Sequence, residues 1–124
     1  MTVKKLPHKH SQNTEEILAK MPDTKYFLEA ATSFQQISDG TRLRIFWLLC
    51  HSEECVSNIA AAVGMTDAAV SHHLKNLKQN GLVDSRRIGK EIHYKLAENE
   101  KAELIHKITD SYFQMSCPNI KNKK

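Results

Sequence analysis

Polar side chains between residues 66 and 78 have the types and the spacing needed to bind a DNA major groove. Short hydrogen-bonding groups come first and lysines follow: Thr66, Asp67, Ser71, His72, Lys75, Asn76 and Lys78. Short polar groups near the start of a helix can reach base edges, and lysines further along can meet phosphates. The same residues would also suit an ordinary solvated helix face, so the elements around them decide between the two interpretations.

A helix-turn-helix would position these side chains. The apolar residues of the same stretch recur at i, i+4 and i+7 and therefore share the opposite face of one helix: Val70, Leu74 and Leu77. Thr66 or Asp67 can cap the first turn of that helix, and Asn80-Gly81 can end it. A shorter helix is expected over residues 56–63, where Gly64 stops it. The pattern predicts two helices joined by a tight turn.

The residues before this motif predict an arm and three helices. Residues 1–12 are polar, contain a proline and show no periodicity, which predicts a flexible N-terminal arm. One helix is expected from about Thr14 to a break at Pro22, and a longer one from Thr24 to a break at Gly40. The third, over residues 42–51, should be the core of the domain because its surface is almost continuously apolar: Leu43, Phe46, Trp47, Leu49 and Cys50.

The residues after the motif predict a basic hairpin. From residue 82 the apolar period changes to two, and residues 82–88 and 91–96 are strand-like segments joined by a turn that contains glycine. Cations come close together at its tip: Arg86, Arg87 and Lys90. Helices, a helix-turn-helix and a basic hairpin make a winged helix, which is a mainly α fold with a small β-hairpin.

The last predicted helix runs from about Glu98 to Met115 and carries a narrow apolar stripe. Its members are Leu104, Ile105, Ile108, Tyr112 and Met115. Because the earlier helices already supply a core, so narrow a stripe is suited to a partner subunit. Residues 13–117 are expected to form one domain for DNA binding and dimerisation, and residues 118–124 a flexible basic tail.

Composition sets the broad class of the protein. The chain has 124 residues and a formal net charge of +4, which fit one domain and permit a polyanionic partner. It has no run of about 18 apolar residues and no apolar core of a signal peptide, so a cytoplasmic protein is expected. Three cysteines are an odd and small number, which argues against a disulfide framework. No phosphate-binding loop or Ser/His/Asp arrangement is visible, which argues against an enzyme.

Several segments of the chain resemble the ArsR/SmtB family of small bacterial repressors. They are DGTRLRI at residues 39–45, CVSNIA at 55–60, AVSHHL at 69–74 and GKEIHYKL at 89–96. The resemblance covers about residues 25–115. It implies a winged helix-turn-helix homodimer, joined through its terminal helices, that binds double-stranded operator DNA and releases it when a metal ion or another inducer binds.

The resemblance also implies which residues meet DNA. Ser71 and His72 match the family's S-H positions and are expected in the major groove, whereas His73 is expected to be structural. The helix start adds Thr66, Asp67 and Ala68, and backbone contacts are expected from Lys75, Lys78, Arg86, Arg87 and Lys90. A two-fold dimer presents its recognition helices to successive major grooves, about 34 Å apart, so the operator should be an imperfect inverted repeat.

A metal ion is the first inducer class that the resemblance implies. Family members that sense thiophilic metals commonly use a Cys-x-Cys pair at the start of the first helix of the helix-turn-helix, completed by Cys or His of the N-terminal arm. Here the matching positions are Cys55 and Ser57. Because the second position is a serine, a purely thiolate-bound ion is disfavoured, and the imidazoles of the arm suit zinc and related ions. The candidate ligands are Cys55, His8 and His10, with Glu54 or Asn58 as an oxygen donor. The alternative is two unconnected histidines in a flexible arm and a half-buried cysteine.

The family's second metal site, on the last helix, is matched only in part. Glu98 and Glu100 correspond to its first pair of ligands, but Ser111 and Gln114 stand where the second pair would be: the site is degraded. His106 and Asp110, one turn apart on that helix, can form a different pair. A surface ion pair is the other interpretation of that spacing.

Two further alternatives remain open from the sequence. A thiol switch would pair Cys50 with Cys117 on exposure to an oxidant or a persulfide, although a cysteine on an apolar helix also suits packing. A winged helix used only for protein contacts would bind its partner independently of salt. DNA binding instead weakens steeply as salt rises, because Lys and Arg displace counterions.

Overall fold

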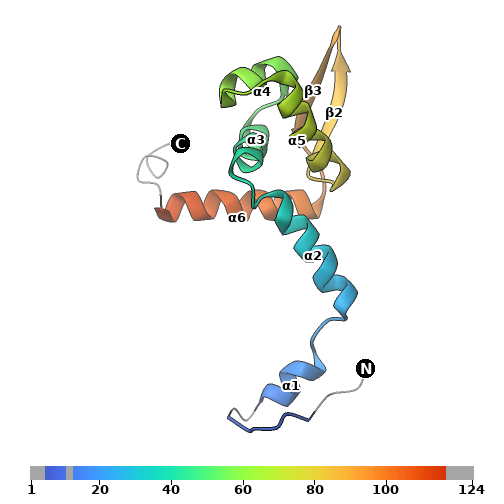
Figure 1. Ribbon diagram of the computed structural model, residues 1–124, viewed down its shortest axis with the longest axis vertical. Helices are drawn as coiled ribbons and strands as arrows, with labels where there is room; N and C mark the ends of the chain where they lie inside the picture. Colours follow the sequence, from blue (N-terminus) through green and yellow to red (C-terminus); the bar gives the residue numbers. More distant parts are fainter. Residues whose placement is uncertain (1–4, 11–12, 117–124) are drawn as a thin grey trace. The chain divides into compact units, whose positions relative to one another are not determined.

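The computed structural model describes residues 5–10 and 13–116, and its internal contacts divide the chain into two units, residues 1–32 and 33–124. No helix in the described ranges is both long enough and apolar enough to span a bilayer. The elements, in chain order, are α1 (Thr14–Ala19), α2 (Thr24–Gln36), α3 (Gly40–His51), β1 (Glu54–Cys55), α4 (Val56–Val63), α5 (Asp67–Gln79), β2 (Val83–Ile88), β3 (Glu91–Leu96) and α6 (Glu100–Ser116) (Figure 1).

The first unit contains α1 and most of α2. Both helices lie where the sequence predicts them, on either side of the break at Pro22. No residue of α1 is buried. Large apolar side chains of α2 are also exposed within the chain: Tyr26, Phe27 and Leu28. The first unit therefore leaves these apolar side chains uncovered.

α3 is the central helix of the second unit. Its cap is Asp39, whose carboxylate accepts a hydrogen bond from the Arg42 backbone N–H at 2.9 Å. Ile45, Phe46 and Leu49 are buried in one apolar cluster with residues of α4, α5 and α6. In Figure 1, α4, α5 and the sheet lie on one side of α3, and α6 runs along the other. The predicted core helix is confirmed.

The helix-turn-helix forms as predicted. Gly64 ends α4 with a φ of 69°, the left-handed conformation that glycine adopts without steric cost. Thr66 caps α5, because its hydroxyl oxygen accepts a hydrogen bond from the Ala69 backbone N–H at 3.1 Å. The apolar face of α5 is completely buried: Val70, Leu74 and Leu77. The opposite, polar face of α5 therefore points to solvent.

The sheet contains a strand that the sequence pattern did not predict. β2 and β3 form the hairpin, and β1 pairs with the other edge of β3, which gives the order β1-β3-β2. Glu54 lies opposite Tyr94 and Cys55 opposite His93 in this antiparallel pairing. A segment of two residues is too short to show a period of two, so only its pairing with β3 defines it.

α6 begins after Asn99, and this residue also holds the helix to the end of the helix-turn-helix. The Asn99 side-chain oxygen accepts a hydrogen bond from the Ala102 backbone N–H at 2.8 Å, which caps α6. Its amide nitrogen donates to the Gly81 carbonyl at 2.9 Å. The cap explains why the helix starts at Glu100 rather than at the predicted Glu98.

α6 carries two apolar stripes rather than the one predicted. Ile105 is only 2% exposed and packs in the core of its own subunit, beside Ala102. The prediction that Ile105 lies in the dimer interface is therefore wrong, because a side chain enclosed by its own subunit cannot reach a partner. The other members of the predicted stripe are exposed: Leu104, Ile108, Tyr112 and Met115.

Candidate nucleic-acid interface and inducer sites

The predicted DNA-contact residues form an exposed polar surface on α5 and the wing, where the wing is the β2–β3 hairpin. Burial of the apolar side of α5 fixes the direction of its polar side, and the hairpin follows α5 directly in the chain. Every residue predicted to meet DNA is exposed: Thr66, Asp67, Ala68, Ser71, His72, Lys75, Lys78, Arg86, Arg87 and Lys90. The fold thus brings the two groups of predicted contacts into one domain with their side chains accessible.

Hydrogen bonds within the protein orient several of these side chains. The Ser57 hydroxyl donates to Asp67 Oδ2 at 2.8 Å and joins α4 to the start of α5. Lys78 Nζ donates to Ser85 Oγ at 2.6 Å and joins the end of α5 to β2. These bonds hold both ends of the recognition helix to neighbouring elements. They also give Asp67 and Lys78 structural partners in the free protein.

Arg86 has a carboxylate partner in the wing. Its Nε and Nη2 atoms donate to the two oxygens of Glu53, at 2.6 and 2.8 Å. The hydrogen bond from Arg86 is the main reason that the pKa of Glu53 lies below its usual value, and Glu53 in turn raises the pKa of Arg86. A phosphate that binds Arg86 therefore has to share or displace this carboxylate.

His73 is structural, as predicted. Its Nδ1 accepts a hydrogen bond from Arg42 Nε at 3.2 Å, which joins α5 to α3, and the same guanidinium donates to Gln36 at 3.3 Å. Burial, followed by the charge of Arg42, lowers the pKa of His73. The neutral imidazole is the form that accepts this bond. His73 is thus directed inward, whereas the adjacent His72 is exposed.

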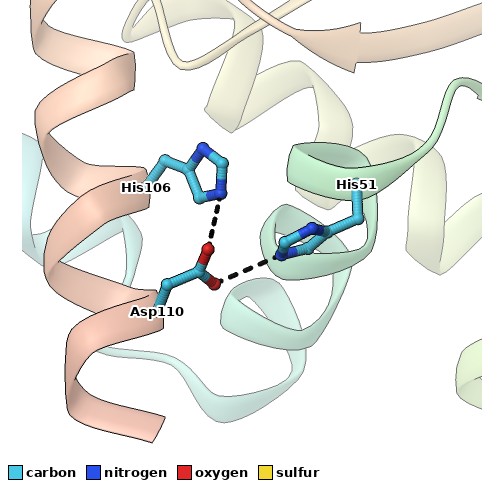
Figure 2. Close-up of side chains that lie close together, drawn as sticks. All are labelled: His51, His106 and Asp110. Carbon is cyan, nitrogen blue, oxygen red and sulfur yellow. Dashed lines mark hydrogen bonds and ion pairs between the residues drawn. The ribbon is translucent and has the colours of Figure 1, made fainter. Parts of the chain in front are cut away.

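A cluster of two histidines and an aspartate lies between α3 and α6 (Figure 2). His51 Nε2 is 3.2 Å from Asp110 Oδ1, and His106 Nε2 is 2.8 Å from Asp110 Oδ2. The sequence predicted only the His106–Asp110 pair and missed His51, because 59 residues separate His51 from Asp110. No local spacing could have pointed to the third member; only the packing of α3 against α6 brings it there.

Comparison with known proteins identifies the family. The family model described as "Bacterial regulatory protein, arsR family" matches residues 39–85. A protein described as a transcriptional repressor SmtB homolog, from a Synechocystis strain, is 31% identical over 104 residues, which are 84% of this chain and 79% of that protein. The chain belongs to the ArsR family.

Other relatives agree with this assignment. A protein from Staphylococcus aureus, described as a cadmium resistance transcriptional regulatory protein CadC homolog, is 33% identical over 81 residues, which are 64% of this chain and 67% of that protein. The homodimeric winged helix-turn-helix DNA-binding domain from Mycobacterium bovis superposes with a TM-score of 0.65 at 32% identity, covering 77% of this chain and 91% of that one. This ArsR-family chain is therefore a DNA-binding transcriptional regulator with a winged helix-turn-helix fold, and not an enzyme.

The predicted arm site of this ArsR-family protein draws on both units of the chain. His8 and His10 belong to the first unit, where their rings stack with centroids 5.7 Å apart. Cys55 belongs to the second unit; it is 6% exposed and precedes α4, beside a hollow of about 230 Å³. The candidate oxygen donors bind one another, because Asn58 Nδ2 donates to Glu54 Oε1 at 2.9 Å. The three-ligand set stays a prediction.

The thiol alternative involves a cysteine that is held in its protonated form. Cys50 is half-buried, and this burial, followed by the charges of Asp110 and Glu103, raises its pKa to about 12. The thiolate is the reactive species, so a thiol with so high a pKa reacts slowly at neutral pH. The predicted partner Cys117 lies outside the described residues.

The family's second metal site does not fit the residues of α6. Glu98 forms an ion pair with Lys95 at 3.2 Å, and Glu100 is the first residue of the helix. Ser111 and Gln114 are exposed, but a hydroxyl and a neutral amide are weak ligands for a transition-metal ion. On the same helix, His106 and Asp110 lie close enough to hold one ion, with Nε2 and Oδ2 2.8 Å apart.

Proposed function

We propose that this ArsR-family protein is a repressor that binds an imperfect inverted-repeat operator as a homodimer and releases it when a zinc-like metal ion binds. Ser71 and His72 read base edges, with Thr66, Asp67 and Ala68 beside them at the start of α5. Lys75, Lys78 and the wing cations Arg86, Arg87 and Lys90 bind the DNA backbone. Leu104, Ile108, Tyr112 and Met115 of α6 pack against the partner subunit.

The observation that carries this proposal is the division of α5 into a buried apolar face and an exposed polar one. Val70, Leu74 and Leu77 anchor the helix completely, so its polar side chains are held in a defined orientation. A rigid helix whose first turns carry short polar groups can enter a major groove without reordering, which lowers the entropic cost of binding. The basic wing adds charge next to it.

A metal ion as inducer is supported by the relatives and by the donor groups available. A homolog of the cadmium-resistance regulator CadC is among the similar proteins, which favours a metal ion over other inducer classes. The residues of this chain offer imidazole and carboxylate ligands together with few cysteines, a set that suits zinc better than a thiolate-bound ion. The high pKa of Cys50 argues against a thiol switch.

The test is a fluorescence anisotropy titration with duplexes selected from random sequence by the wild-type protein. Ser71→Ala and His72→Ala should each weaken binding to the selected duplex by roughly 10-fold, with the dimer intact in sedimentation. Ser38→Ala is the matched control, since Ser38 is an exposed serine outside the helix-turn-helix. Wild-type affinity in either variant would show that the substituted residue does not contribute to DNA binding. Salt-independent binding would favour a protein-interaction module.

Release is tested in the same titration with zinc chloride and, separately, with a persulfide donor. Zinc should weaken operator binding at least tenfold, a coupling free energy of about 1.4 kcal/mol or more. Equal affinity with and without zinc would overturn the metal-responsive part of the proposal. Release by the persulfide alone, with the loss of two hydrogen atoms from the protein as the persulfide oxidises the two thiols, would instead favour the pairing of Cys50 with Cys117.

A further inference from the structure

We propose that His51, His106 and Asp110 form a binding site for a divalent transition-metal ion that joins α3 to α6 within one subunit. This site differs both from the arm site of Cys55, His8 and His10 and from the degraded second site on α6. The regulatory consequence rests on the proposed function, whereas metal binding by the three residues does not.

The geometry of the cluster is close to that of a metal centre. One donor atom from each residue lies within 4.8 Å of the other two. Asp110 stands between the imidazoles, 3.2 Å from His51 Nε2 and 2.8 Å from His106 Nε2 (Figure 2). Ligands at about 2.1 Å from a tetrahedral zinc ion are roughly 3.4 Å from each other. Side-chain rotations that displace the donor atoms by about 1 Å are therefore enough to bring them to the spacing of zinc ligands.

The cluster is partly exposed to solvent and partly held by neighbouring side chains. The exposed fractions of the side chains are 43% for His51, 30% for Asp110 and 21% for His106, so an ion can enter beside His51 and keep a water ligand. The ring of Trp47 packs against that of His51 with centroids 4.7 Å apart. Glu103 Oε2 lies 4.0 Å from His106 Nδ1, where an outer carboxylate can orient a ligating imidazole.

The buried nitrogen of His106 is a second observation that points to a cation. Nε2 is buried and, despite its 2.8 Å approach to Asp110, has no hydrogen-bond partner of suitable geometry among the described residues. A buried polar atom whose contact with a carboxylate lacks hydrogen-bond geometry is incompletely satisfied. An ion between Nε2 and the carboxylate would use the nitrogen lone pair and the oxygen charge together, and would satisfy both groups.

The position of the site links it to the recognition helix. α3 is bonded to α5 through Arg42 and His73, and α6 is bonded to the end of the helix-turn-helix through Asn99 and Gly81. An ion that fixes α3 against α6 therefore fixes the recognition helix relative to the helix that carries the proposed dimer contacts. If the two recognition helices are then held at the wrong separation, metal and operator bind in opposition to each other.

The test is a titration of the full-length protein, without DNA, with zinc or cobalt(II) against a chromophoric chelator. His51→Gln, His106→Gln and Asp110→Asn should each weaken binding at least roughly tenfold. His93→Gln is the matched control, because His93 also lies near a carboxylate, Glu91, but outside the cluster. Undiminished affinity in all three cluster variants would overturn the proposal.

An imidazole NMR measurement on the wild-type protein covers the case in which a variant fails to fold. Zinc should shift the ring resonances of His51 and His106 and leave those of His93 in place; shifts confined to other histidines would overturn the proposal. The operator titration separates this inference from the proposed function. If zinc binds at the cluster but does not release the operator, the proposed metal-responsive function is contradicted and the metal site is not. If zinc still releases the operator from the Asp110→Asn variant, the regulatory role of the cluster is contradicted and the proposed function is not.

Discussion

Arg86 in the wing is held by Glu53 through two hydrogen bonds, from Nε to Oε2 at 2.6 Å and from Nη2 to Oε1 at 2.8 Å. Glu53 directly precedes β1, which is one edge strand of the sheet, and Arg86 lies in β2, which is the other. The Arg86–Glu53 pair therefore links the two edges of the sheet across β3. It also places a negative charge within a surface that we propose binds DNA.

Removal of that negative charge should strengthen DNA binding. Glu53→Gln frees the Arg86 guanidinium for phosphate and is expected to raise the affinity for duplex DNA by roughly threefold to tenfold at low salt. The measurement is anisotropy with a fluorescent duplex. Glu100→Gln, which removes an exposed carboxylate from α6, should change the affinity little. Weaker binding by Glu53→Gln would mean that Glu53 orients Arg86 toward DNA instead of competing for it.

Lys75 should contribute charge rather than sequence specificity. It is exposed on α5, one turn after Ser71, where a lysine can meet a phosphate. Lys75→Ala is expected to weaken binding to specific and unrelated duplexes alike, and to reduce the slope of log affinity against log salt by about one. Lys107→Ala on α6 is the control with the same change of charge. A loss restricted to the selected duplex would assign Lys75 to base recognition.

The stability of the domain should fall as the pH is lowered through the histidine range. Burial and the charge of Arg42 keep the pKa of His73 below its ordinary value of 6.5, so the unfolded chain takes up this proton at a higher pH than the folded one. The stabilising contribution is present above pH 6.5 and is lost as the pH falls below it.

Urea unfolding of the wild-type protein at about pH 7.5 and at about pH 5.5 measures this effect. His73→Gln should show a smaller difference between the two conditions than the wild type does. His72→Gln, a change of the adjacent exposed histidine, should retain the wild-type difference. An unchanged pH dependence in His73→Gln would assign the proton uptake to another group.

Ile105 and Ile108, three residues apart on α6, should stabilise different things: the core of the subunit and the dimer, respectively. Ile105 is 2% exposed, and Ile105→Ala should lower the free energy of unfolding by about 2–5 kcal/mol because it opens a cavity in the core. Ile108 is 45% exposed, and Ile108→Ala should leave the fold of the subunit intact while weakening the dimer by roughly tenfold. Unfolding at one fixed protein concentration measures the first effect, and sedimentation over a concentration series measures the second.

The outcome for Ile108 decides where the dimer contact lies. An Ile108→Ala variant that dimerises as tightly as the wild type would move the interface away from this face of α6. The exposed apolar side chains of α2, such as Phe27, would then be the next surface to test.

Most of the helix-turn-helix could be predicted from the sequence because its signals are local. The spacing of Val70, Leu74 and Leu77 defined the buried face of α5, and Thr66 marked its cap. Once that face is known, the exposure of Ser71 and His72 follows from the helical period alone. The hairpin was predictable for the same reason, since Ile92, Tyr94 and Leu96 alternate along β3 and Gly89 marks the turn before it.

Tertiary structure decided the features that depend on residues distant in the chain. β1 exists only through its pairing with β3, and Glu53 meets Arg86 across 33 residues. His51 joins the His106–Asp110 pair because α3 packs against α6, and the same packing buries Ile105. Helical periodicity shows that a set of residues shares a face, but it cannot tell which of two adjacent apolar stripes meets the core. That choice is made by the shape of the surface against which the helix packs.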